Sequence, residues 1–228
     1  MNKYEITKRI EHFAPVETAE AWDCVGYMVD TGKTDVSKIM LCLTVTEDIV
    51  KQAKEQNCDM IISHHPCFYT PLDWKDIDIY SAHTNLDKAK NGTTDTLIQK
   101  LGFEPQNSYN DYLRFVDFEQ PIEIKKFVKL LKNISPNMRY VNNKNTNTIK
   151  RIAFCAGSGS EFLKEAQSEG AEAFVTGDLK FHTAADAEIV VFDIGHFESE
   201  ILVLPTIETL ISKDIEIIYA EEKSPFVY

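Results

Sequence analysis

The sequence repeats a pattern at a fixed spacing of 113 residues. Residues 38–42 (Lys-Ile-Met-Leu-Cys) match residues 151–155 (Arg-Ile-Ala-Phe-Cys), and Ile-Ile-Ser at 61–63 matches Phe-Val-Thr at 174–176. Buried β-α-β segments resemble one another whatever their origin, but one ungapped offset through several of them indicates an internal duplication. We therefore expect two similar α/β lobes related by an approximate twofold axis.

The same offset relates two pairs of polar residues. His83 is followed four residues later by Asp87, and His196 is followed four residues later by Glu200 (196 − 83 = 113). If each pair opens a helix, its imidazole and carboxylate lie on one helical face. The periodic pattern of buried strands does not by itself produce two such pairs, so we expect the two corners to close over metal ions.

The segment from residue 38 to residue 63 predicts a β-α-β unit. A β-rich run ends near residue 45, Thr46 is a candidate helix cap, and a second apolar run occupies residues 59–63. Such a unit implies parallel strands with a right-handed crossover. The fold class expected is α/β, with two three-layer lobes and a metal site between them.

The best internal boundary is the polar, turn-rich stretch at residues 104–111. It divides the chain into an N-terminal lobe at residues 1–108 and a C-terminal lobe at residues 109–228. Elements could be exchanged between the lobes. A short amphipathic helix at residues 4–13 should start the fold.

Composition excludes several classes of protein. The 228 residues carry 36 acidic and 24 basic side chains, a formal charge of −12, which argues against a broad nucleic-acid or anionic-membrane surface. The N-terminus has no apolar signal region, and no stretch approaches the ~20 apolar residues of a membrane span. Five scattered cysteines without a C-x-x-C pair favour reduced thiols. We expect a cytoplasmic protein.

Five of the six histidines stand at or just after the ends of expected strands. They are His64, His65, His83, His182 and His196. Ligands of open parallel sheets bind at the carboxyl ends of strands, so these imidazoles should gather where a site would form. Imidazole and carboxylate are the usual ligands of zinc, iron, manganese or cobalt. A set sufficient for two divalent ions, if one carboxylate bridges them, is His64, His65, Asp87, His196 and Glu200.

Two of these assignments have structural alternatives. Adjacent residues on a strand point to opposite faces, so His64 and His65 reach one site only if the chain leaves the strand at Pro66. His83 could cap its helix, bind metal, or orient Asp87 from behind; we favour this supporting role.

Asp178 and His182 remain open between two interpretations. Asp178 occupies the place of His65 in the repeat (65 + 113 = 178) and could simply cap the next helix. Alternatively, the two side chains hold ligands in place or shuttle protons.

The glycine turn at residues 157–160 (Gly-Ser-Gly-Ser) is weak evidence for a phosphorylated substrate. It lies between an expected strand and an expected helix, where backbone N–H groups can cradle a phosphate. The chain has no P-loop pattern and no nucleophile elbow.

Five motifs in chain order resemble those of the Nif-three-like family, whose members are labelled type 2 homologues of GTP cyclohydrolase I. They are Trp22-Asp23-x-Val25-Gly26, Ser63-His64-His65-Pro66, Ala82-His83-Thr84-Asn85-Leu86-Asp87, Thr176-Gly177-Asp178 and Gly195-His196-Phe197-Glu198-Ser199-Glu200. The resemblance implies two α/β lobes, a dinuclear metal site and a ring-like homohexamer. Its ligand set falls on the same five residues as above.

The chain also departs from the family pattern. Many relatives have Asn in place of Cys24 and Gly in place of Asp30, and longer relatives insert an extra domain between the lobes. Any function of that insert is not expected here.

The leading functional hypothesis is a metal-dependent hydrolase that acts through a metal-activated water. His182 or His83 would relay protons to a leaving group. The family label implies GTP or another small phosphorylated compound as substrate. The alternative is a metal-binding, metal-delivery or regulatory interaction protein without turnover.

Overall fold

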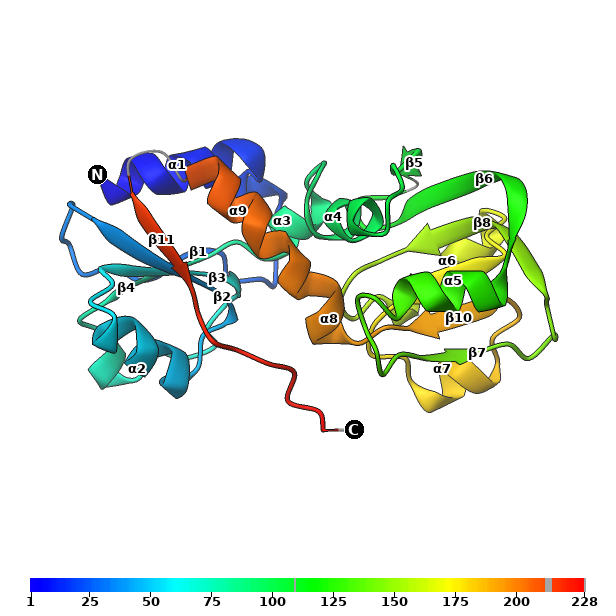
Figure 1. Cartoon of the computed structure of the whole chain (residues 1–228). Helices are drawn as coiled ribbons and strands as arrows, with labels where there is room; N and C mark the ends of the chain where they lie inside the picture. The colour runs from blue at the N-terminus through cyan, green and yellow to red at the C-terminus, as the bar shows by residue number, and fades with distance from the viewer. Residues whose placement is uncertain (109, 212–214, 228) are drawn as a thin grey trace. The chain divides into compact units, whose positions relative to one another are not determined.

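A computed structural model describes residues 1–108, 110–211 and 215–227 of the chain. The chain forms two compact units, which are described separately (Figure 1). Unit 1 comprises Met1–Gly92 and Val203–Lys223, and unit 2 comprises Thr93–Leu202 and Ser224–Tyr228. The sequence predicted a domain boundary at residue 108. A division of the chain by compactness does not test where folding domains begin and end, so this boundary stays a prediction.

Unit 1 is built on a five-stranded sheet. The strand order is β1 (Gly26–Val29), β4 (Asp78–Ser81), β3 (Met60–His65), β2 (Lys38–Thr44) and β11 (Glu216–Tyr219). Neighbouring strands from β4 to β11 are parallel, and β1 is antiparallel to β4. The last strand of the chain therefore completes the first sheet.

Helices cover both faces of this sheet (Figure 1). They are α1 (Lys3–Phe13), α2 (Glu47–Glu55), α3 (Thr84–Lys88) and α9 (Leu204–Ile211). The hydroxyl of Thr46 accepts the N–H of Ile49 and caps α2, whose apolar side packs on Ile61 and Ile79. The expected helix at residues 4–13 and the expected β-α-β unit are confirmed.

Unit 2 contains a six-stranded sheet. The strand order is β5 (Asn107–Ser108), β6 (Arg114–Glu123), β8 (Thr148–Phe154), β9 (Ala173–Thr176), β10 (Val190–Asp193) and β7 (Arg139–Val141). The central strands β8, β9 and β10 are parallel, and β7 adds an antiparallel edge to β10. The helices of this unit are α4 (Thr93–Lys100), α5 (Ile124–Leu131), α6 (Leu163–Ser168), α7 (Phe181–Ala185) and α8 (His196–Glu200).

The strands of unit 2 alternate side chains between two cores, as a period of two requires. Phe154 and Val175 pack with Phe127 of α5 on one face. Ala153 and Phe174 pack with α6 on the other. Unit 2 therefore has three layers, and the predicted α/β class is confirmed for both units.

The register of the strands shows where the internal repeat holds. Ile39 pairs with Met60 in unit 1, and Ile152 pairs with Ala173 in unit 2, so both strands keep the offset of 113 (152 − 39 and 173 − 60). The third strand does not. Ser63 pairs with Ser81, whereas Thr176 pairs with Asp193, an offset of 112 (193 − 81).

The expectation of one ungapped offset is therefore wrong for the third strand and its helix. Unit 2 has one residue fewer between its second and third strands, so the helix cap His83 corresponds to the helix cap Gly195. His196 then corresponds to Thr84. The two His-x-x-x-acid pairs do not occupy equivalent backbone positions.

None of the helices in the described residues combines the length and apolar character needed to cross a membrane.

Candidate metal centre

The first cluster lies at the carboxyl end of β3 and the start of α3 in unit 1. His64 and His65 end the strand, and His83 caps the helix. One nitrogen from each of these imidazoles lies within 4.8 Å of the others, so the three residues form a group that could hold a metal ion. β3 ends at His65, directly before Pro66, and both neighbouring histidines reach the cluster. Three of the five histidines that were expected to gather, His64, His65 and His83, therefore lie together.

Two of these imidazoles are held in one tautomer by oxygen atoms that can only accept. His64 is fully buried, and its Nδ1 lies 2.9 Å from the carbonyl oxygen of Ala82. The Nδ1 atom of His83 lies 2.9 Å from Oδ1 of Asp23. Each Nδ1 therefore carries a proton and donates it, and in the neutral imidazole this tautomer has its lone pair on Nε2. A lone pair on Nε2 is what a metal ion requires.

His65 and Asp87 complete this cluster. The Nδ1 atom of His65 lies 2.6 Å from the hydroxyl of Thr44, its partner across the β2–β3 ladder. Asp87 is on α3, and its Oδ1 lies 3.4 Å from Nε2 of His64. The carboxylate thus faces the ring nitrogen of His64 that does not contact Ala82. The role of Asp87 and His64 as metal ligands stays a prediction.

Asp23 is a functional candidate to which the motif analysis gave no role of its own. Its buried carboxylate accepts hydrogen bonds from His83 and from both the N–H (3.0 Å) and the hydroxyl (2.5 Å) of Thr84. Burial acts to raise the pKa of this carboxyl, but the hydrogen bonds from Thr84 and His83 outweigh it and lower the pKa. Asp23 therefore stays ionised and fixes the orientation of His83.

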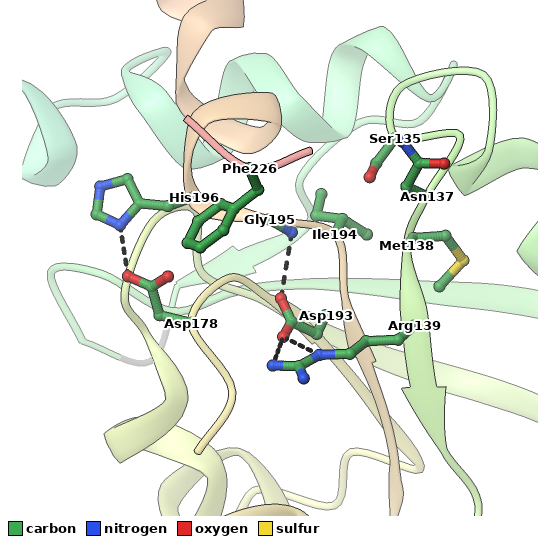
Figure 2. Close-up of a pocket in the computed structure, with 10 residues that line it drawn as sticks. All are labelled: Ser135, Asn137, Met138, Arg139, Asp178, Asp193, Ile194, Gly195, His196 and Phe226. Atoms are coloured by element: carbon green, nitrogen blue, oxygen red, sulfur yellow. Dashed lines mark hydrogen bonds and ion pairs between the residues drawn. The ribbon is translucent and has the colours of Figure 1, made fainter. Parts of the chain in front are cut away.

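The second cluster lies where β10 passes into α8 in unit 2. His196 opens the helix and Glu200 lies one turn further on, with Nε2 and Oε2 2.8 Å apart. On the other side of the ring, Nδ1 lies 2.7 Å from Oδ2 of Asp178 (Figure 2). Burial acts to lower the pKa of His196, but hydrogen bonds and charge from Glu200 and Asp178 outweigh it and raise the pKa to about 9. The expected i, i+4 pairing on one helical face is confirmed.

Glycine is required beside this cluster because of close approach. A Cβ atom on Gly157, which has φ +66°, would lie 1.9 Å from Oε1 of Glu200. A Cβ on Gly177 would lie 2.8 Å from the backbone nitrogen of His196. The glycine turn at residues 157–160, which the sequence weakly suggested as a phosphate site, thus makes room for the buried carboxylate of Glu200.

Asp178 does not cap the following helix. The cap of α7 is Lys180, and no side chain there bonds the first turn. Asp178 instead has a left-handed backbone, φ +52°, and its carboxylate bonds His196. Non-glycine residues in this conformation are uncommon and cluster at functional sites. The structural alternative for Asp178 is therefore wrong.

In the described residues, His182 belongs to neither of these two clusters. It lies exposed on α7, where its ring contacts the exposed ring of Phe181. Its predicted part in proton transfer stays a prediction.

The fold and these clusters define a class: a two-lobe α/β protein whose parallel strands end in oriented histidines and carboxylates. The model of the Duf34/NIF3 (NGG1p interacting factor 3) family matches residues 1–225. The chain belongs to this family, and the resemblance noted from its motifs is confirmed.

One curated relative aligns with this chain over its full length. The "GTP cyclohydrolase 1 type 2 homolog" of Clostridium perfringens is 34% identical over 262 aligned positions, covering 100% of both chains. Among solved structures, reduced HcgD from Methanocaldococcus jannaschii is 28% identical with a TM-score of 0.84, covering 97% of this chain and 98% of that one. The protein ybgI has a TM-score of 0.89 at 19% identity and covers 99% and 100%, a likeness of fold alone.

Proposed function

We propose that this protein is a metal-dependent hydrolase that holds two divalent metal ions. The proposed ligands are His64, His65, Asp87, His196 and Glu200. The observation that carries the proposal is the common orientation of the histidines. Nδ1 of each proposed histidine ligand lies within hydrogen-bonding distance of an oxygen atom. In unit 1 one ring nitrogen each of His64, His65 and His83 lies within 4.8 Å of the others.

The donor set fits a borderline transition metal. Imidazole nitrogen with carboxylate oxygen suits zinc, iron, manganese or cobalt better than magnesium or calcium, which prefer oxygen alone. Metal-binding histidines almost always donate their second N–H to a carboxylate or a carbonyl. Asp23, Asp178 and the carbonyl of Ala82 accept in this way. The residues present therefore suit such ions.

The residues of the chain would have distinct parts in hydrolysis. Bound divalent ions polarise a substrate oxygen and lower the pKa of water. Asp178 and Asp23 hold His196 and His83 in the required orientation through the hydrogen bonds described above. His83 and His182 remain our candidates for moving protons to the leaving group. The names of the curated relatives support hydrolytic ring opening and make GTP the first substrate to test.

The experiment is a turnover assay on metal-loaded protein with GTP, phosphoesters and cyclic amides. The account predicts turnover that His64→Ala abolishes. His12→Ala is the matched control, because His12 is exposed on α1 in the same unit and is remote from the cluster in sequence. Metal binding without turnover on any of these compounds would replace the hydrolase with a metal-binding, metal-delivery or regulatory protein.

We also propose that the chain assembles into a homohexamer, as the family resemblance implies. Light scattering after gel filtration should give six times the 26.0 kDa of one chain. A monomer mass would contradict this proposal.

A further inference from the structure

Unit 2 contains a pocket beside His196 to which no role has been given so far. It lies at the carboxyl end of β10, between the loop before β7 and the C-terminal segment, and has a volume of about 200 Å³. Figure 2 shows the ring of Phe226 lying across it near His196 and Ile194. A cavity of about 150 Å³ accommodates benzene, so the pocket has room for one substituted ring.

The walls favour a flat ligand. Met138 and Phe226 provide apolar surface in the lining, next to the fully buried Ile194. Phe226 is 63% exposed, so its ring face is available to a stacking partner. Aromatic rings stack with an offset and without directional hydrogen bonds, which selects planar shape more than chemical identity.

The cations in the pocket are already paired with carboxylates. Nε and Nη2 of Arg139 each lie 2.8 Å from Oδ2 of Asp193, and Nη2 also donates to the carbonyl of Leu179. The imidazole of His196 lies between Asp178 and Glu200. Two carboxylates line the pocket, Asp178 and Asp193, and a third, Glu200, contacts His196. Their negative charge disfavours phosphate and carboxylate groups.

The pocket also offers a polar handle. The side-chain amide of Asn137 makes no hydrogen bond with the described residues, and it lines the pocket opposite the ring of Phe226 (Figure 2). An amide both donates and accepts, which matches the edge of a ring that carries a carbonyl and an amino group.

We propose that this pocket binds a flat, nitrogen-containing ring that bears no anionic group, stacked on Phe226 and hydrogen-bonded to Asn137. The inference rests on the proposed function in one respect, since a ring bound here lies beside His196 and would present its bonds to the hydrolytic residues. Arg139 and Asp193, which pair with each other, also line the pocket.

The test is a titration of the full chain with cytosine, a neutral ring with a carbonyl and an amino group. Metal is first removed with a chelator, and ligand-detected NMR then monitors binding. Saturable binding is expected for the wild type. Phe226→Ala should weaken it about fivefold or more, since stacking on an aromatic side chain is worth about 1–3 kcal/mol per ring. Phe181→Ala is the matched control because Phe181 is an exposed phenylalanine of the same unit outside the pocket lining, and it should bind as the wild type does.

Three results would overturn the inference. The first is that cytosine shows no saturable binding at millimolar concentration. The second is that Phe226→Ala binds cytosine as tightly as the wild type. The third is that inorganic phosphate binds and Arg139→Ala abolishes this binding, which would assign the pocket to anions. Zinc binding is measured separately on the same samples. A wild-type protein that binds cytosine but no zinc contradicts only the proposed function. A wild-type protein that binds zinc but no cytosine contradicts only the ring pocket.

Discussion

The two strand-to-helix corners, one in each unit, reach the same kind of cluster by different means. In unit 1 the corner after β4 caps its helix with His83, and Asp23, 60 residues away in sequence, holds that ring. In unit 2 the corner after β10 caps its helix with Gly195, and His196 becomes the first helical residue. A duplicated scaffold therefore does not imply duplicated side-chain positions.

The corner in unit 2 has a cost in backbone conformation. The corner in unit 2 places Glu200 against Gly157 and requires left-handed conformations at Gly157, Asp178 and Gly195. In unit 1 the left-handed non-glycine residues, Asn57 and Asn91, lie outside the cluster. We infer that the cluster of unit 2 depends on these backbone conformations and that His83 in unit 1 depends on the carboxylate of Asp23.

The largest effect is expected from Gly157→Ala. The added Cβ would overlap Oε1 of Glu200, and φ +66° is unfavourable for alanine. Left-handed strain of about 1–2 kcal/mol and disruption of the hydrogen bond from His196 to Glu200 together predict a loss of roughly 3 kcal/mol or more. The measurement is the free energy of unfolding in urea, followed by circular dichroism.

Gly170→Ala is the control for that experiment. Gly170 also has a left-handed backbone, φ +81°, but a Cβ there meets nothing within 4 Å. Only the strain of about 1–2 kcal/mol should remain. Equal losses for the two variants would show that Glu200 does not constrain position 157.

Asp23→Asn tests the dependence of unit 1 on a distant carboxylate. The substitution keeps the shape of the side chain but removes the charge that holds His83 and Thr84. Loss of a residue that supports the ligands of a metal site typically costs 10–100-fold in metal affinity. The ring of His83, which Asp23 holds, contacts the rings of two proposed ligands, with centroids 5.1 Å from His64 and 5.5 Å from His65. Competition with a zinc chelator measures the change.

Asp59→Asn is the matched control, because Asp59 also accepts backbone N–H groups in unit 1, at the start of β2. Its metal affinity should equal that of the wild type. An unchanged affinity in Asp23→Asn would show that Asp23 and its contact with His83 do not contribute to metal binding.

Thr44→Val should have a smaller effect on metal affinity. It removes the hydroxyl 2.6 Å from Nδ1 of His65 while keeping a β-branched side chain in β2. A neutral hydrogen bond contributes about 0.5–1.5 kcal/mol, so the affinity should fall about twofold to tenfold. The same chelator competition measures it, and a loss as large as that of Asp23→Asn would contradict the ranking of the two supports.

The smallest effect concerns acid stability in unit 1. Hydrogen bonds from Lys3 and the N–H of Gly32 lower the pKa of Asp30, and hydrogen bonds from Ser37 outweigh burial to lower the pKa of Asp59. Because both pKa values are depressed in the folded state, their stabilising contribution is present above about pH 4 and is lost as the pH falls further.

Tryptophan fluorescence can follow this loss, since Trp22 and Trp74 both belong to unit 1. Asp59→Asn should flatten the decline in the urea midpoint between pH 5 and pH 3, by less than about 1 kcal/mol because the side chain is exposed. A decline of unchanged slope in this variant would show that Asp59 contributes nothing to it.

Much of the fold and part of the site could be predicted from the sequence. Apolar periodicity locates α1 and the β2-α2-β3 unit, and strand ends locate His64, His65 and His83. These signals are local, which is why a single sequence contains them.

Other features depend on contacts that local patterns do not encode. The hydrogen bond between Asp23 and His83 joins residues 60 positions apart, and the one-residue shift at β10 is visible only in the strand register. Phe226 reaches the pocket of unit 2 from the end of the chain. The ligand set could therefore be predicted from the sequence, whereas the residues that support these ligands are visible only in the structure.

The most direct test of the account is elemental analysis of purified protein after loading with zinc and dialysis. The account predicts two ions per chain in the wild type, fewer in His64→Ala and in Glu200→Gln, and the wild-type content in His12→Ala. A wild-type protein without bound metal, or variants of His64 and Glu200 that retain the full content, would contradict the claim that these two clusters hold metal.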